Sequence, residues 1–192
     1  FATDRPIKTL QEAVVGADVF LGLSVANVLT KEMVRSMNAD PIVFALANPN
    51  PEISYADAMA SRDDIIFATG RSDYPNQINN VLGFPYIFRG ALDTHAKAIN
   101  EEMKRAAVYA IADLAKEPVP DVVNAAYKLK RTTFGRDYIL PKALDPRLLT
   151  RVSCAVAKAA IDSGVSRKTI TDWEGYANHL REMMGYDNKL LR

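Results

Sequence analysis

The chain has 192 residues, enough for a domain with a sizeable hydrophobic core, and its 48% hydrophobic and 24% charged residues are ordinary for a globular protein. A formal net charge of +1 gives no bulk electrostatic reason to expect nucleic acid or an acidic membrane as a partner. No apolar run approaches the roughly 20 residues that cross a bilayer. A single cysteine, Cys154, excludes an internal disulfide and favours a reducing, cytoplasmic setting.

The first residue is Phe1 rather than methionine, and neither a basic region nor an apolar signal core follows it. We therefore expect the sequence to start inside a larger protein. That expectation matters because the Gly-rich dinucleotide fingerprint G-x-G-x-x-G occurs nowhere in the chain.

Helix start signals recur through the first sixty residues. The capping-box pattern Thr9-Leu-Gln-Glu12 predicts a short helix that ends near Gly16. Two further helices are predicted, from Thr30 to about Met37 and from Ser54 to about Ser61.

Apolar runs between these helices predict strands at 18–21, 42–46 and 65–69, and the continuous run at 42–46 is typical of a strand buried on both faces. This alternation predicts βαβ units, whose right-handed crossovers place the three strand C-termini on one edge. Three strands are few for such a domain, so we expect the missing strands before Phe1. The predicted fold class is α/β: a partial Rossmann-like parallel sheet with helices, followed by a helical C-terminal extension.

After residue 80 the pattern changes to helix. Helices are predicted at 83–95, 100–116, 120–127, 145–164 and 166–184. The helix from 145 begins with Asp145-Pro146, an N-cap followed by proline at the first helical position. Residues 128–141 are predicted to form a loop with a short strand at 138–140.

Two of the predicted strands run abruptly into Gly, Pro and Asn. The strand at 42–46 is followed by ANPNPE at 47–52, and the strand at 65–69 by GRSDYPNQINN at 70–80. In an open parallel sheet, ligands bind in the crevice beyond the carboxyl ends of the strands. Neutral amides placed there can hydrogen-bond a polar ligand without adding charge.

Each candidate residue at these strand ends also has a purely structural interpretation. Asn48 follows a strand directly, but Asn-Pro-Asn-Pro is also turn chemistry. Asn79 and Asn80 lie between a loop and a helix, where either could be a helix N-cap. Gly22 and Ser24 follow the first strand, where glycine either lets a ligand approach the backbone or simply makes a turn.

The loop after the third strand starts at Gly70 and, with the loops at Gly22 and Asn48, is predicted to line one cleft. Arg71 and Asp73 could reach that cleft, but an ion pair that holds the loop is at least as good an interpretation. His95, His179 and Cys154 form no metal-binding pattern; we interpret the histidines as surface or structural residues and the cysteine as a small core residue.

Both strand-end sequences resemble malic enzymes, the decarboxylating malate dehydrogenases, and more specifically the bacterial type with a fused phosphate-acetyltransferase-like region. The resemblance covers nearly the whole chain. Its most specific part runs from Gly70 to Asp93, and the stretch FGRDYILPKALDPRL at 134–148 is a second family-like signature.

The resemblance implies part of an oxidoreductase that converts malate to pyruvate and carbon dioxide with NADP or NAD. Residues 1–144 would form a partial NAD(P)-binding Rossmann-like domain, and residues 145–192 a helical extension toward a downstream domain. The fragment by itself is expected to be inactive.

The family pattern implies substrate-binding roles for Asn48, Asn80 and Asn79, with Asn79 serving mainly to orient the loop. It implies cofactor-binding roles for Asn48, Asn80, Gly22, Ser24 and Gly70. No catalytic residue or metal ligand of the family matches this chain, so the ligands of Mg²⁺ or Mn²⁺ are expected upstream. The implied partners are malate and pyruvate, further copies in a homo-oligomer and a fused phosphate-acetyltransferase-like domain, with no nucleic acid and no membrane.

Two other classes of protein remain open. Another Rossmann-type dehydrogenase, acting on a hydroxy acid or an amino acid, would share the strand-end loops. A non-catalytic assembly or regulatory module would use the helical tail for contacts. The sequence does not distinguish NAD from NADP.

Overall fold

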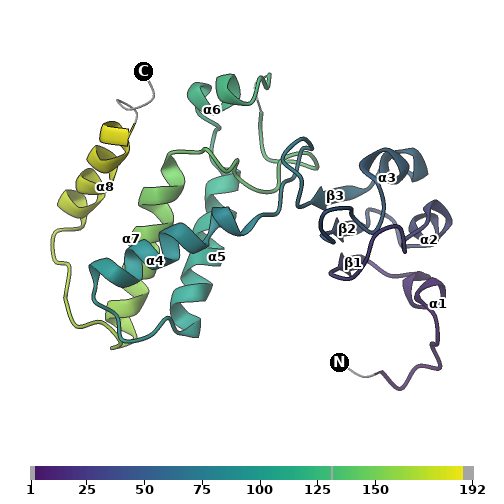
Figure 1. The fold of residues 1–192 in the computed structure, drawn as a ribbon, viewed down its shortest axis with the longest axis horizontal. Helices are drawn as coiled ribbons and strands as arrows, with labels where there is room; N and C mark the ends of the chain where they lie inside the picture. The colour runs from purple at the N-terminus through teal and green to yellow at the C-terminus, as the bar shows by residue number, and fades with distance from the viewer. Residues whose placement is uncertain (1–2, 131, 188–192) are drawn as a thin grey trace. The chain divides into compact units, whose positions relative to one another are not determined.

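The computed structural model describes residues 3–130 and 132–187 and forms two compact units (Figure 1). The strand unit comprises Phe1–Ile78 with Gly135–Asp137, and the helical unit comprises Asn79–Phe134 with Tyr138–Arg192. The chain therefore divides structurally after Ile78, whereas the sequence analysis divided it between 144 and 145. The boundary at 144/145, which separates the predicted NAD(P)-binding part from the helical extension, stays a prediction.

The strand unit contains a three-stranded parallel sheet in the order β1-β2-β3. The strands are β1 (Val19–Gly22), β2 (Ile42–Ala45) and β3 (Ile66–Thr69). The helices are α1 (Leu10–Val14), α2 (Lys31–Arg35) and α3 (Tyr55–Ser61). The expected α/β arrangement is confirmed, because all three strands run in the same direction and their last residues pair in register.

Helices cover one face of this sheet (Figure 1). Phe20, Val43 and Phe67 point to that face and are buried with Val34 of α2 and Ala58 of α3. On the other face the side chains of β1 are exposed, and β2 alternates buried with half-buried residues. The burial of both faces that we expected for residues 42–46 is therefore not seen, because the described helices pack against one face.

The helix starts of the strand unit follow their sequence signals. In α1 the Thr9 hydroxyl accepts the backbone N–H of Glu12 at 3.2 Å, and the Glu12 carboxylate accepts that of Thr9 at 3.2 Å. The side chains of Thr30 and Ser54 accept backbone N–H groups in the first turns of α2 and α3. Such caps satisfy N–H groups that have no partner inside the helix.

The helical unit is built around one long helix, α7. Its elements are η1 (Asn80–Leu82), α4 (Phe84–Asp93), α5 (Glu101–Lys116), α6 (Asp121–Ala126), α7 (Arg147–Asp162) and α8 (Trp173–Asp187). Helix α7 packs against α4, α5 and α8 (Figure 1). Its buried stripe repeats every four residues: Leu148, Val152, Val156 and Ala160. This spacing places one apolar face of α7 against its neighbours.

The last helix begins later than predicted. Helix α8 starts at Trp173, not near Ser166, and the Asp172 side chain accepts the Gly175 N–H at 2.8 Å. The residues before it are bound to the end of α4 instead. The backbone N–H groups of Arg167 and Lys168 both donate to the Thr94 carbonyl, at 3.1 and 3.0 Å. These tertiary hydrogen bonds prevent the first turn that local sequence would allow.

The short strand predicted at 138–140 does not form. Tyr138 is a single β-bridge residue, and the two residues after it form bends, so no second strand extends the pairing. Its side chain is buried instead. The prediction is wrong because an apolar run becomes a strand only where a second strand accepts its hydrogen bonds.

Gly90 sets the separation of α4 and α7. A Cβ atom at this position would lie 2.7 Å from the Ser153 carbonyl oxygen and 2.9 Å from the Ala157 nitrogen and the Val156 Cβ. Two of these three neighbours are backbone atoms, which cannot rotate away. The two helices can therefore approach this closely only where α4 lacks a side chain.

We expect Gly90→Ala to lower the free energy of unfolding by about 1–3 kcal/mol, because the added methyl group would force the two helices apart. Urea denaturation followed by circular dichroism measures this quantity. Gly185→Ala in α8 is the control, since a Cβ there would meet no atom within 4 Å. Equal denaturation midpoints for the two variants would contradict the proposed close packing.

Candidate functional site

The three predicted strand-end loops leave the sheet at one edge. Gly22, Ala45 and Thr69 end β1, β2 and β3 at the same level of the ladder. The Leu46 N–H also donates to the Gly22 carbonyl at 3.1 Å, which extends the pairing by one residue. The edge at which ligands bind in open parallel sheets is thus built from the segments that the sequence analysis selected.

A buried carboxylate, not recognised from the sequence, joins two of these loops. Glu52 is fully buried. One of its oxygens accepts the backbone N–H of Ser24 at 2.9 Å, and the other accepts that of Ala47 at 3.0 Å. Glu52 therefore links the loop after β1 to the loop after β2. A sequence signal did exist, since this acid ends the polar run ANPNPE between a buried strand and a helix.

Gly22 lies directly against this carboxylate. A Cβ atom on Gly22 would be 2.4 Å from the Glu52 Cδ and less than 3 Å from both of its oxygens. From the sequence, Gly22 could either let a ligand approach the backbone or make a simple turn. The structure gives a third reason: the space in front of the glycine is occupied by the protein's own carboxylate.

Asn48 is exposed at the start of the loop after β2, one residue beyond Ala47. Its peptide bond to Pro49 is cis. Within residues 3–130 and 132–187, its side-chain amide has no hydrogen-bond partner. An amide that faces solvent from an otherwise anchored loop can both donate to and accept from a ligand.

The loop after β3 folds back onto its own strand. The Thr69 N–H donates to the Asn76 carbonyl at 3.1 Å, and the Ile78 N–H donates to the Thr69 carbonyl at 2.9 Å. The buried amide of Asn76 donates to the carbonyls of Phe67 and Arg136, at 2.9 and 2.6 Å. Asn76 is thus a second anchoring residue that the sequence analysis passed over, in favour of its neighbours in the same motif.

Gly70 begins this loop and is exposed. The nearest atom to a Cβ there would be the Ile78 carbonyl oxygen, at 3.7 Å. Arg71 and Asp73 form the ion pair that the sequence analysis proposed, with contacts of 2.9 and 2.7 Å. This hydrogen bonding lowers the pKa of the Asp73 carboxyl. The pair thus holds the loop.

Segments that follow all three strands line one hollow of about 270 Å³. Its lining residues are Asn27, Asn50, Pro51, Ser54, Tyr55, Arg71 and Tyr74. The rings of Tyr55 and Tyr74 stack with centroids 4.5 Å apart, and the Arg71 guanidinium lies 5.5 Å from the Tyr74 ring centre. The loops therefore share a hollow, but Gly22, Asn48 and Gly70 are not among the residues that line it.

Asn79 and Asn80 belong to the helical unit and differ in their contacts. The Asn79 side-chain oxygen accepts the Val81 N–H at 3.0 Å and so caps η1. Asn80 is exposed, and in the described chain its side chain has no hydrogen-bond partner. The structural interpretation thus holds for Asn79, while the amide of Asn80 is available to a ligand.

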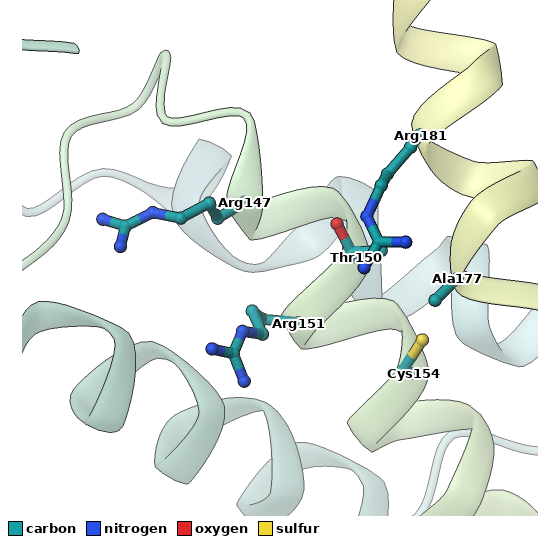
Figure 2. Close-up of a pocket in the computed structure, with 6 residues that line it drawn as sticks. All are labelled: Arg147, Thr150, Arg151, Cys154, Ala177 and Arg181. Carbon is teal, nitrogen blue, oxygen red and sulfur yellow. The ribbon is translucent and has the colours of Figure 1, made fainter. Parts of the chain in front are cut away.

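A second hollow, of about 510 Å³, lies between α7 and α8 of the helical unit. Its lining residues are Arg147, Thr150, Arg151, Cys154, Ala177 and Arg181 (Figure 2). Arg147 is paired with Asp145 at 2.7 Å, and both Arg147 and Arg151 contact Glu117. Figure 2 shows Arg147 and Arg151 pointing away from α8, whereas Arg181 reaches from α8 toward Thr150. The charges of Arg147 and Arg151 are thus paired with carboxylates of the protein itself, and these two side chains do not converge on the hollow.

Cys154 lines this hollow and is half-buried, so it is not the fully enclosed core residue that the sequence suggested. Its Sγ points toward Ala177 of α8 (Figure 2). Burial raises the pKa of the thiol, and the charge of Arg181 opposes that shift more weakly.

The described residues do not form a metal centre. Within residues 3–130 and 132–187, no three His, Cys, Asp or Glu side chains gather closely enough to hold an ion. His95 and His179 are both exposed. Over the same residues, no helix has the length and hydropathy needed to span a membrane.

Comparison with known proteins gives a consistent result. Residues 2–134 match the family model for the malic enzyme NAD binding domain. An NADP-dependent malic enzyme of Haemophilus influenzae is 56% identical over 189 residues, which are 98% of this chain and 25% of that protein. An NADP-dependent malic enzyme of Halomonas elongata is 59% identical over 168 residues, which are 88% of this chain and 40% of that protein.

The fold agrees with the same family. The crystal structure of a malic enzyme from Entamoeba histolytica superposes with a TM-score of 0.81 at 36% sequence identity, over 96% of this chain and 36% of that one. This chain therefore spans between a quarter and about two fifths of the length of these proteins.

We expect Gly22→Ala to destabilise the strand unit by about 1–3 kcal/mol, because its methyl group would occupy the position of the Glu52 carboxylate. Urea denaturation measures the change. Gly135→Ala is the matched control in the same unit, since a Cβ there would meet no atom within 4 Å. The packing argument is wrong if both substitutions leave the midpoint unchanged.

Iodoacetamide should alkylate Cys154 more slowly than it alkylates glutathione at pH 8. The reactive form is the thiolate, and a raised pKa leaves less of it at a given pH. The rate should climb as the pH rises through that pKa. Mass spectrometry of the labelled chain gives the rate, with Cys154→Ser as the unlabelled control; labelling as fast as that of glutathione would disprove the shift.

Proposed function

This chain belongs to the malic enzyme family through its NAD-binding domain, and on that premise we propose that the protein containing it oxidises malate with NADP or NAD and decarboxylates the product to pyruvate and carbon dioxide. The observation that carries the proposal is the family match over residues 2–134, which includes all three strand-end loops. Because the chain spans only part of its relatives, the activity is proposed for a longer protein. The 192-residue chain alone is expected to be inactive.

We assign the recognition of malate mainly to Asn48 and Asn80. Both side chains are exposed, and neither has a hydrogen-bond partner in the described chain, which supports their availability to a ligand. Asn48 would also contact the nicotinamide of the cofactor. Asn79, whose oxygen is already used as a helix cap, would hold the turn that presents Asn80. Amides do not titrate usefully, so these residues would orient the reactants and not carry protons.

The cofactor would lie along the loops at Gly22, Ser24 and Gly70. The exposed Gly70 and the exposed amide of Asn48 fit a polar ligand at this edge. The Ser24 N–H is already bound by Glu52, so Ser24 would contribute its hydroxyl or its carbonyl. NADP or NAD supplies the hydride acceptor, and the residues of this chain position it.

A divalent ion, Mg²⁺ or Mn²⁺, does not fit the residues described. Over residues 3–130 and 132–187 there is no group of three ligands, so we propose that the ion is held by parts of the protein outside this chain.

Several further features are proposed for the whole protein: a homo-oligomer, a cytoplasmic location and a fused phosphate-acetyltransferase-like domain. The single cysteine supports the reducing location. The relatives differ in length: the matched part of this chain covers 40% of the Halomonas protein but only 25% of the Haemophilus one. This difference supports a fused domain in the longer relatives and none in the shorter. The longer proteins have room for an additional domain.

In the full-length protein, Asn80→Ala should reduce kcat/KM for malate by about ten- to a hundredfold. The substitution removes a hydrogen bond to a charged substrate, which is worth roughly 1.5–3 kcal/mol. Steady-state kinetics with malate varied at saturating cofactor measures the loss.

Asn79→Ala is the matched comparison, because it lies in the same turn but its side chain caps η1. We expect a smaller kinetic loss and a lower melting temperature. Equal kinetic losses at the two positions, or a loss confined to the KM of the cofactor, would show that the roles are wrongly assigned.

A further inference from the structure

Glu52 is a buried carboxylate with no cation beside it. Two acidic side chains of the described chain are almost completely buried, Glu52 and Asp145. Asp145 is paired with Arg147 at 2.7 Å. Among residues 3–130 and 132–187, no Lys, Arg or His forms an ion pair with Glu52. Its charge is compensated by backbone N–H groups alone.

Burying a carboxylate is costly unless hydrogen bonds replace its hydration. At Glu52 the two replacement donors come from different loops: the Ser24 N–H at 2.9 Å and the Ala47 N–H at 3.0 Å. Each oxygen holds one loop, so the planar carboxylate fixes the distance between them. Gly22 packs directly against this carboxylate, since even a methyl group at Gly22 would displace it.

Backbone hydrogen bonds already hold the same segment in place. The Leu29 N–H donates to the Glu52 carbonyl at 3.0 Å, and the Asn27 N–H donates to the Pro51 carbonyl at 3.1 Å. The loop after β2 would therefore stay attached to the loop after β1 without the Glu52 side chain. What the side chain adds is the alignment of two particular peptide groups, those at Ser24 and Ala47.

We propose that Glu52 is a positioning residue for hydride transfer. It sets the Ala47 N–H, one residue before Asn48, against the Gly22–Ser24 loop. Asn48 would contact malate and nicotinamide, and the loop would line the cofactor cleft. This inference rests on the proposed function. Glu52 is buried and does not itself reach the reactants; it acts through Asn48 and the cofactor loop.

The test is made in the full-length protein with Glu52→Gln. Glutamine has the same size but can accept only one of the two N–H groups, since its amide nitrogen is a donor. We expect kcat/KM for malate to fall about ten- to a hundredfold, as for the loss of a charged hydrogen bond. The primary deuterium isotope effect, with malate deuterated at C2, should rise because hydride transfer becomes slower relative to binding.

The matched control is Glu32→Gln, at an acidic residue of the same unit whose side chain is 74% exposed. It should leave both the kinetics and the isotope effect unchanged. A third variant, Gly22→Ala, pushes the carboxylate away, so its kinetic loss should not add to that of Glu52→Gln in the double variant. If Glu52→Gln fails to fold, Glu52→Asp makes the same test, because it keeps the charge but shortens its reach.

The results distinguish the positioning role of Glu52 from the proposed malate oxidation. A wild-type protein that does not oxidise malate overturns the proposed function and the positioning role together. An active wild type, with a Glu52→Gln variant that loses only thermal stability and keeps its kinetics and isotope effect, overturns the positioning role alone. Additive losses for Gly22→Ala and Glu52→Gln would also overturn it.

Discussion

The contact between Gly22 and the Glu52 carboxylate is the constraint on which the sheet edge depends. Parallel strands bring loops to one edge, but they do not decide how those loops lie beside each other. Glu52 does so by accepting an N–H from each of two loops, and it can enter only because Gly22 has no side chain. Two of the three strand-end loops, those that carry Ser24 and Asn48, are therefore joined by one buried carboxylate.

In the helical unit, too, a glycine allows a close contact, but the contact is between two helices and not with a carboxylate. At Gly90 an absent side chain lets α4 approach the backbone of α7, as the absent side chain of Gly22 admits a carboxylate. Helix α7 then packs its apolar stripe against α4 and α5, and it also contacts α8. Asn79 and Asn80 start this unit, and the side chain of Asn79 caps the short helix that begins with Asn80.

Much of the local structure could be predicted because its causes are local. Thr9, Thr30 and Ser54 cap helices as their sequence contexts indicate, and the three apolar runs form the expected parallel strands. The predicted pairing of Arg71 with Asp73 is also confirmed, since only one residue lies between them. The family could likewise be read from the long motif at 70–93, because so many consecutive matches do not arise by chance.

The sequence by itself determined where the strands lie and that they are parallel, most of the helix starts, the family and which amides follow the strands. These features depend on neighbouring residues or on a continuous motif. Tertiary structure alone decided the buried role of Glu52, the late start of α8 and the failure of residues 138–140 to form a strand. The first two depend on a partner far along the chain: Ser24 lies 28 residues before Glu52, and Thr94 is about seventy residues from the segment before α8. The third depends on the lack of a second strand that would extend the pairing. The spacing of residues in a sequence does not show which distant backbone group will form a hydrogen bond with a buried polar atom.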